Sequence, residues 1–206
     1  MSENAVIFGY SGHAYVILEL LAASGIIATG YFDAEEKQKN PFSLTYYGTG
    51  NDEADFAKIA GDNAYIAIGN NQVRARIFDN LERNKISCPV AIHPKATVSP
   101  SVKVGEATVV MAGAVINAMA NIGKAAICNT SCVIEHECVV GDYAHIGPGA
   151  VLAGNVKVGA GTFIGANSVV KQGTTIGAGV TVGAGSVIVS DIPDGVTIFG
   201  NPAKVR

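Results

Sequence analysis

Two histidines and two glutamates cluster in a stretch otherwise made mostly of small and aliphatic residues, NTSCVIEHECVVGDYAHIGPGA at positions 129–150. His136 lies between Glu135 and Glu137, and His145 follows. An imidazole titrates near neutral pH, so it can take a proton from an amine or hydroxyl that attacks an acyl donor. Either glutamate can orient such a ring. The alternative, that these are solvated turn residues, is less favoured because the surrounding sequence carries so little charge.

A six-residue repeat predicts the secondary-structure elements on which this cluster lies. In each hexad one position is aliphatic, with one cysteine as the exception, and the residue two places earlier is small or valine. Such a repeat predicts a parallel β-helix in which three hexads form a coil and both positions point inward. The series runs without a gap through Ile92, Val98, Val104, Val110, Ile116, Ile122, Cys128, Ile134, Val140, Ile146, Leu152, Val158, Ile164, Val170, Ile176, Val182 and Ile188.

This register places the two histidines outside the predicted core. Ala144 and Ile146 point inward, so His145 between them should point out, and His136 falls at a turn of the coil. Because half a coil separates them, they should lie on different sides of one prism. The unbroken register leaves no long loop, so we expect the active site on the outer faces, with a neighbouring subunit of a cyclic oligomer supplying the other wall.

The four cysteines do not indicate a metal site. Cys128, Cys132 and Cys138 fall at inward positions, where free cysteine behaves as a small hydrophobic residue. Nothing in their spacing, or in that of Cys88, makes thiolates converge as a metal requires. We therefore predict no metal.

Residues 4–85 follow a different pattern, in which short strands alternate with helices. Strands are expected in AVIFG, GIIATGYFD and AYIAIGNN, and helices in HAYVILELLAAS and VRARIFDNLERN. The segment between the second and third strands should be irregular up to position 52, with a short strand at 44–48. This alternation predicts an α/β, Rossmann-like domain with a short parallel sheet over residues 1–87, followed by the β-helix and a C-terminal cap over residues 88–206.

Three loops of the first domain follow strands and should meet at one edge of the sheet, where ligands of open parallel sheets bind. The first, FGYSGHA, opens a helix whose backbone N–H groups favour phosphate. The second begins with an acidic residue that suits a ribose or base. The residues expected to bind the nucleotide part of a substrate are Gly9, Ser11, Gly12, His13, Asp33, Gly69, Asn70 and Asn71.

Composition excludes two partner classes. The net charge is −3 and the 14 lysines and arginines are scattered, which argues against nucleic acid. No run of 18 apolar residues and no signal peptide is present, so we expect a cytoplasmic protein without a membrane partner.

The motifs NTSCVIEHECVVGDYAHIG, GYSGHA, AIGNNQVR, IHPKATVSPS and GNPAK occur in this order and resemble the NeuD- and PglD-type hexapeptide-repeat sugar acetyltransferases along essentially the whole chain. The resemblance implies a left-handed β-helix, a homotrimer with acetyl-CoA between subunits, and N-acetylation of a nucleotide-linked, UDP-type 4-amino-4,6-dideoxysugar of the N-acetylbacillosamine pathway. It makes His136 the general base, Glu137 its orienting carboxylate, and places His145 near the acetyl group. Ala34 departs from a related enzyme, which has a second acidic residue there.

Acetyl-CoA is the expected co-substrate. Asn129 matches a family asparagine in the same cleft, and the C-terminal segment that leaves the repeat can either contact CoA or only cap the last coil. The residues expected to bind acetyl-CoA are His145, Asn129, Gly165, Pro202 and Lys204.

Three other functions stay open. An O-acetyltransferase acting on a sugar hydroxyl, of the sialic-acid type, would keep the mechanism and change the acceptor. A metal-dependent lyase similar to γ-type carbonic anhydrases would need three convergent imidazoles, and the β-helix offers only His136 and His145. A non-catalytic, trimeric nucleotide-binding scaffold would not need His136 or Glu137.

Overall fold

The computed structural model describes residues 4–51, 53–59 and 61–206. Contacts divide the chain into two compact units, Met1–Pro94 and Lys95–Arg206. Residues 1–3 of the predicted first domain and Asp52, the end of the predicted irregular connection, lie outside the described residues.

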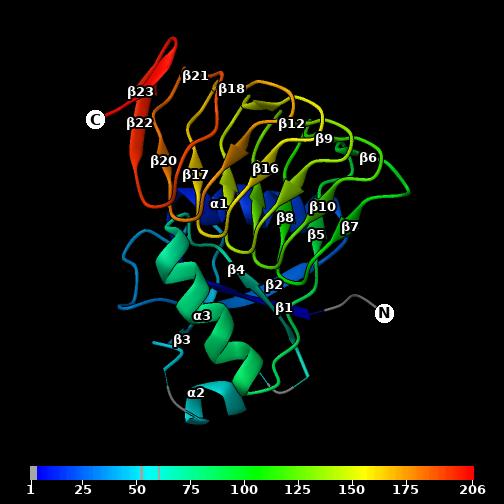
Figure 1. The fold of residues 1–206 in the computed structure, drawn as a ribbon. Coiled ribbons are helices and arrows are strands. Elements are labelled where there is room, and N and C mark those ends of the chain that lie inside the picture. The colour runs from blue at the N-terminus through cyan, green and yellow to red at the C-terminus, as the bar shows by residue number, and fades with distance from the viewer. Residues whose placement is uncertain (1–3, 52, 60) are drawn as a thin grey trace. The chain divides into compact units, whose positions relative to one another are not determined.

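The first unit contains a parallel sheet with strand order β3-β2-β1-β4 (Figure 1). In β1 the four residues from Ala5 to Phe8 are all buried, which is typical of a parallel strand covered on both faces. The strands of this sheet are β1 (Asn4–Phe8), β2 (Ile27–Phe32), β3 (Thr45–Gly48) and β4 (Asn63–Ile66); the short β5 (Ala91–Ile92) follows in the chain and is not part of the sheet. The predicted Rossmann-like class is confirmed by this parallel sheet.

The helices of this unit are α1 (Gly12–Ala23), α2 (Glu53–Ala57) and α3 (Asn71–Arg83). Helix α1 buries Ala14, Ile17 and Leu21, whose spacing of three and four residues forms one apolar stripe. Helix α3 begins after Asn70, whose side chain accepts a hydrogen bond from the backbone N–H of Val73 at 3.0 Å and so caps the helix. The short α2 was not predicted.

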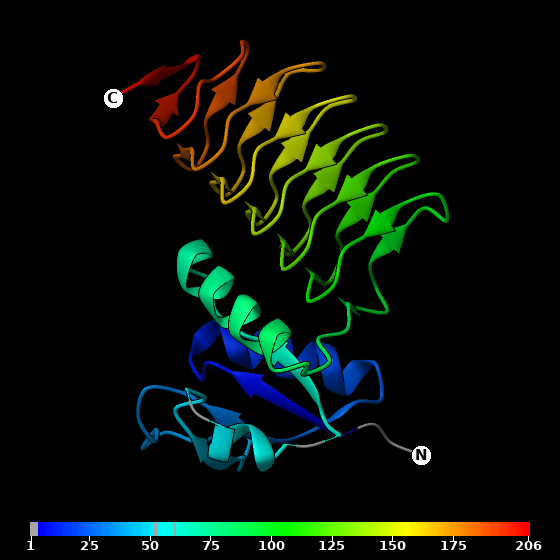
Figure 2. The same cartoon turned by 60° about the horizontal axis from the view of Figure 1, so that its bottom comes forward.

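The second unit is a parallel β-helix of two-residue strands whose coils stack in chain order, from green to red in Figure 2. Strands 18 residues apart pair in parallel, so that Ile127 lies beside His145 and Val133 beside Val151. One coil is therefore three hexads, as the repeat predicted, and the predicted β-helix is confirmed.

Three sheets form the sides of this β-helix. One contains β7 (Lys103–Val104), β10 (Asn121–Ile122), β13 (Val139–Val140), β16 (Lys157–Val158) and β19 (Thr175–Ile176). Another contains β6 (Thr97–Val98), β9 (Val115–Ile116), β12 (Val133–Ile134), β15 (Val151–Leu152), β18 (Val169–Val170) and β21 (Val187–Ile188). The third contains β8 (Val109–Val110), β11 (Ile127–Cys128), β14 (His145–Ile146), β17 (Phe163–Ile164), β20 (Thr181–Val182), β22 (Thr197–Gly200) and β23 (Ala203–Val205).

The interior of the coils holds the predicted aliphatic and small residues from Val110 onward. Cys128, Cys132 and Cys138 are fully buried there and are free thiols, as expected. Ile92, which the repeat placed inside, is instead 40% exposed. It stands at the start of the series, where no earlier hexad can cover it.

Candidate active site

His136 lies at the turn between β12 and β13, with its side chain 52% exposed. Its Nδ1 is 3.1 Å from Oε2 of Glu137, whose side chain is 65% exposed. An ionised carboxylate can only accept a hydrogen bond, so in the neutral ring Nδ1 carries the proton and Nε2 has the lone pair. This is the tautomer that a general base needs.

Glu137 occupies a strained backbone position. Its φ is +60°, and the structure repeats a positive φ at every sixth residue from Ala107 to Gly185. Glycine suits such a position best, and a glutamate there costs about 1 kcal/mol. The same conformation is adopted by Met119, Ser131 and Tyr143 at other turns, so it belongs to the coil and does not by itself mark a functional site.

Glu135, the other candidate for orienting the ring, has a different partner. Its Oε2 accepts a hydrogen bond from Nδ2 of Asn117 at 2.9 Å, one coil earlier. Of the two glutamates, the structure thus pairs Glu137 with His136.

His145 lies on the outer side of β14 and is almost fully covered there. Ile146, the next residue of the strand, belongs to the core, and successive side chains of a strand point to opposite faces, so His145 points out of the coil as predicted. The residue is nevertheless only 8% exposed. The ring of Phe163, one coil on, meets the imidazole edge to face with ring centroids 5.0 Å apart. Outward-facing side chains in adjacent coils cover one another, which period alone does not reveal.

The residues expected to bind acetyl-CoA follow one sheet of the β-helix. Asn129 comes directly after β11, His145 is in β14, Gly165 comes directly after β17, and Lys204 is in β23. Asn129 Nδ2 lies 2.9 Å from His145 Nε2. Four strand spacings separate β14 from β23, which is about 19 Å. The series therefore suits an extended ligand that runs along the stack.

Three of the residues expected to bind acetyl-CoA also have structural explanations. A Cβ on Gly165 would stand 2.5 Å from the backbone of the next coil, so this glycine allows close stacking. Pro202 and Lys204 are exposed and belong to the antiparallel hairpin of β22 and β23, which follows the last coil. The expected contact with CoA stays a prediction for all of them.

The first unit contains a cavity of about 420 Å³ at the carboxyl ends of its strands. Two of the residues expected to bind the nucleotide, Gly9 and Asp33, line it. The other predicted residues do not line it: they are Ser11, Gly12, His13, Gly69, Asn70 and Asn71. Ser11 and Gly12 are exposed at the start of α1, and the 69–71 loop is engaged in forming the start of α3.

A buried arginine explains why the 69–71 loop is held away from the cavity. Arg74 is 1% exposed, and its guanidinium donates hydrogen bonds to the carbonyl oxygens of Ile68 and Gly69 and to Oδ1 of Asn71 at 2.8–3.1 Å. Burial lowers the pKa of Arg74 to about 10. Burial, with the charge of Arg74 as a second cause, lowers the pKa of His13 to about 4. His13 is therefore neutral at pH 7 and adds no positive charge for a diphosphate.

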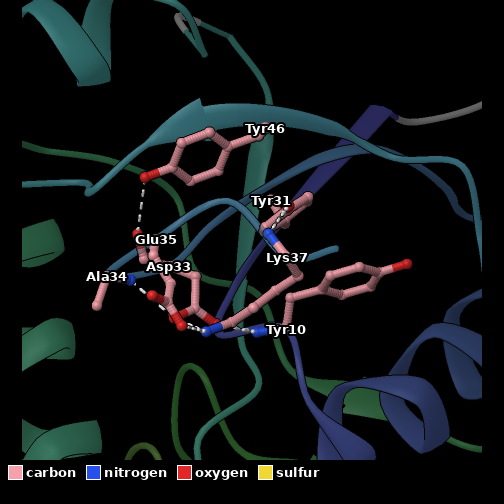
Figure 3. Close-up of polar contacts among 7 residues, drawn as sticks. All are labelled: Tyr10, Tyr31, Asp33, Ala34, Glu35, Lys37 and Tyr46. Carbon is pink, nitrogen blue, oxygen red and sulfur yellow. Dashed lines mark hydrogen bonds and ion pairs between the residues drawn. The ribbon is translucent and has the colours of Figure 1, made fainter. Parts of the chain in front are cut away.

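Asp33 is fixed by its own loop (Figure 3). Its Oδ2 accepts the backbone N–H of Tyr10 at 2.8 Å, and its Oδ1 accepts that of Ala34 at 2.7 Å and lies 3.1 Å from Nζ of Lys37. The hydrogen bond to Asp33 raises the pKa of Lys37. The carboxylate thus joins the loop after β1 to the loop after β2 and faces the cavity from a rigid position.

Sequence reasoning missed most of the cavity wall. One side comes from α3, whose residues at helical spacing are Val73, Arg76, Ile77 and Asn80, and another from Thr49, Gly50 and Asn51. The amphipathic pattern of α3 was visible in the sequence but indicated only packing. Among the residues that line the cavity, Arg76 supplies a cation and Asn80 an amide. Phe8 and Phe32, which also line it, are stacked with ring centroids 4.7 Å apart. Such a wall suits a flat polar ring with a phosphate.

Among the described residues, no group of three or more metal-ligating side chains converges. The buried thiols are poor nucleophiles: a hydrogen bond with Cys132, together with burial, raises the pKa of Cys128, and burial raises that of Cys138. None of the helices in the described part of the chain is long and apolar enough to cross a membrane.

Comparison with known families gives two matches. Residues 4–81 match the PglD N-terminal domain, and residues 155–190 match the bacterial transferase hexapeptide repeat. A curated relative, UDP-N-acetylbacillosamine N-acetyltransferase of Bacillus subtilis (strain 168), is 38% identical over 112 residues, which are 53% of this chain and 52% of the relative. The chain thus spans about half the length of that curated relative in the matched region.

Two solved structures match along nearly the whole chain. The acetyltransferase domain of PglB from Neisseria gonorrhoeae FA1090, in complex with acetyl coenzyme A, has a TM-score of 0.93 at 38% identity, with 100% of both chains covered. PerB from Caulobacter crescentus, in complex with CoA and GDP-perosamine, has a TM-score of 0.92 at 39% identity, with 98% of this chain and 97% of that chain covered.

Proposed function

The chain belongs to the PglD- and PglB-type sugar N-acetyltransferases of the hexapeptide-repeat family, and we propose that it transfers the acetyl group of acetyl-CoA to the 4-amino group of a UDP-linked 4-amino-4,6-dideoxysugar. Membership of this family, predicted from the sequence motifs, is confirmed by these matches. The transfer follows from what the relatives bind and from the side chains that this chain presents.

The observation that carries the proposal is the pair of His136 and Glu137. The two side chains are 3.1 Å apart on the outside of the β-helix, at an exposed turn where a substrate has access. Surface ion pairs contribute little to stability, so stability gives little reason for this pairing. A glutamate beside the ring is suited to stabilise its protonated form, which a general base requires.

The reaction needs one bond to form and one to break. The sugar amine attacks the thioester carbonyl, a C–N bond forms, the C–S bond breaks, and CoA leaves as its thiolate. His136 Nε2 accepts the proton that the amine loses and can return it to the leaving thiolate, while Glu137 holds Nδ1 and stabilises the protonated ring.

The two substrates are assigned to different parts of the chain. We assign acetyl-CoA to the series of residues from Asn129 to Lys204 along one sheet of the β-helix, and the nucleotide to the cavity lined by Asp33 and α3. The relatives differ in nucleotide, because one is named for a UDP-sugar and another is bound to GDP-perosamine. The choice of UDP is therefore part of the proposal.

We further propose that the enzyme acts as a homotrimer with active sites between subunits, as the family resemblance implies. An exposed His136 on a β-helix side would gain a second wall from a neighbouring copy. The cytoplasmic location expected from the sequence stays a prediction.

The test is acetyl transfer by the purified protein. Release of the CoA thiol from acetyl-CoA is measured with UDP-, dTDP- and GDP-linked 4-amino-4,6-dideoxysugars, and mass spectrometry identifies the acetylated product. We expect turnover with the UDP-sugar and a loss on the order of 10²- to 10⁴-fold in His136→Ala. Gln172→Ala, at the equivalent turn two coils later, is the matched control and should be unaffected.

The other outcomes separate the alternatives. Turnover only with GDP- or dTDP-sugars would keep the reaction and overturn the UDP assignment. Acetylation of hydroxyl-bearing sugars alone would replace the amine by a hydroxyl. A folded protein that binds acetyl-CoA and nucleotide but acetylates no sugar, with or without His136, would favour a scaffold.

A further inference from the structure

Gly154 is the residue that lies under His136. It stands one coil later in the same column of turns, 18 residues on, and the backbone N–H of its neighbour Asn155 donates to the carbonyl oxygen of His136 at 2.8 Å. The column consists of Ala118, His136, Gly154 and Gln172, and of these four only Gly154 is buried. Its burial at an otherwise exposed turn shows that the turn is covered there.

The imidazole of His136 covers Gly154. An ideal Cβ built on Gly154 would stand 2.5 Å from Nε2, 2.6 Å from Cε1 and 3.3 Å from Cδ2 of the ring. Real Cβ atoms do not approach other atoms so closely, so the ring occupies the space that a side chain at position 154 would need.

The backbone does not require glycine at this position. The left-handed residue of this turn is Asn155, with φ +56°, and Gly154 itself has no positive φ. Ala118, His136 and Gln172 show that the same position of the coil accepts a Cβ elsewhere. Gly154, the one residue of this column without a Cβ, is therefore also the residue against which the His136 ring packs.

The ring atom closest to a Cβ built on Gly154 is Nε2, which is also the atom that would accept the proton. Glu137 engages Nδ1, so Nε2 remains for the substrate, and Nε2 is the ring atom nearest to the missing Cβ. An exposed ion pair alone leaves a side chain freedom to rotate, whereas a ring that also packs against backbone has two constraints.

We propose that Gly154 is a positioning residue for His136: the absence of its side chain leaves space on the next coil for the imidazole, which packs there with Nε2 available to the substrate amine. This inference rests on the proposed role of His136 in acetyl transfer and adds a second support, besides Glu137, for the ring.

The first test is Gly154→Ala, which adds a single methyl group and keeps the backbone N–H. We expect kcat to fall on the order of 10- to 100-fold while KM for acetyl-CoA and for the nucleotide sugar each change about twofold or less, because the ring moves and the binding surfaces do not. Gln172→Ala, in the same column, should keep the kcat of the unaltered protein. An unchanged kcat in Gly154→Ala would overturn the proposal.

The second test does not depend on activity. Urea unfolding is compared for the unaltered protein, Gly154→Ala, His136→Ala and the double variant. We expect Gly154→Ala to lower the urea midpoint when His136 is present and to leave it unchanged or raise it when His136 is alanine, since the methyl group then meets no ring. Equal effects in both backgrounds would mean that the ring does not rest on Gly154. This result holds even if no tested sugar is acetylated, so a failure of the proposed function remains distinguishable from a failure of this inference.

Discussion

His145 Nε2 lies 2.9 Å from Nδ2 of Asn129, whose Oδ1 accepts the backbone N–H of Thr130 at 2.8 Å. Because the amide oxygen is already used as an acceptor, the amide NH₂ faces the ring, and Nε2 of His145 must accept. The proton of His145 is therefore on Nδ1. In this tautomer Nε2 cannot donate a hydrogen bond. The contact with Asn129 therefore selects the tautomer of His145.

Replacing Asn129 tests this assignment. In Asn129→Asp both side-chain oxygens accept, so the ring would have to donate from Nε2 instead. We expect kcat to fall about tenfold or more, because a histidine in the wrong tautomer presents the wrong atom to its ligand. Steady-state kinetics and ¹⁵N shifts of the His145 ring would report it. Asn121→Asp, which puts the same charge on an exposed strand residue, is the control; equal rates for both variants would contradict the role of Asn129.

Glu137→Gln tests the orientation of His136. The amide keeps the shape of the side chain and tolerates the same backbone, but it cannot stabilise the protonated ring by charge. We expect kcat to fall on the order of 10- to 100-fold with both KM values nearly unchanged. Glu135→Gln, whose side chain contacts Asn117 instead, should have a much smaller effect, and a larger loss there would reassign the orienting carboxylate.

Arg76→Ala tests the cavity of the first unit. Arg76 lines it from α3, and removing its charge should raise the Kd for the nucleotide on the order of 10- to 100-fold, which corresponds to the roughly 1.5–3 kcal/mol of a charged hydrogen bond. Isothermal titration with UDP measures this directly. Arg83→Ala removes the same charge from the end of the same helix, outside the cavity, and should bind UDP normally. A normal Kd in Arg76→Ala would remove the nucleotide from this cavity.

His13 should make the first unit acid-sensitive. Its pKa is lowered to about 4 in the fold from 6.5, so between these values the unfolded chain binds a proton that the folded chain does not. His13 therefore does not affect the free energy of unfolding at high pH. It lowers that free energy progressively as pH falls from about 6.5 to about 4. At pH 5 the loss is about 2 kcal/mol.

His13→Gln should remove that loss. Urea unfolding followed by near-ultraviolet circular dichroism is suitable because six of the chain's seven tyrosines are in the first unit, so the signal reports mainly that unit. We expect the variant to lose less stability than the unaltered protein between pH 8 and pH 5. An identical pH dependence for both would show that His13 titrates normally in the folded protein.

A neighbouring pair of valines tests the inward and outward faces of the coils. Val170 is fully buried inside the β-helix, and Val169 beside it is 42% exposed. Val170→Ala should lower the free energy of unfolding by about 2 kcal/mol through lost burial and a cavity, and Val169→Ala by less than about 0.5 kcal/mol. Equal losses in urea unfolding would place the register of β18 in doubt.

The sequence by itself determined the β-helix and the position of the catalytic candidates on it. A strict six-residue repeat has one solution, since only one phase buries all aliphatic positions from Val110 to Ile188. It follows that residues 18 apart stack and that His136 is at an exposed turn. The alternation of strands and helices likewise determined the parallel sheet and the edge at which Gly9 and Asp33 meet.

The tertiary structure decided which side chains meet. The repeat predicts which way a side chain points but not what covers it, so the burial of His145 under Phe163 was not visible. The repeat also did not distinguish Glu137 from Glu135 as the partner of His136; only the family resemblance favoured Glu137. The loop at Gly69–Asn71 was expected at the ligand because it follows a strand, but hydrogen bonds to Arg74 hold it at the start of α3. Contacts between residues far apart in the chain depend on side-chain packing in three dimensions, and a local pattern carries no information about them.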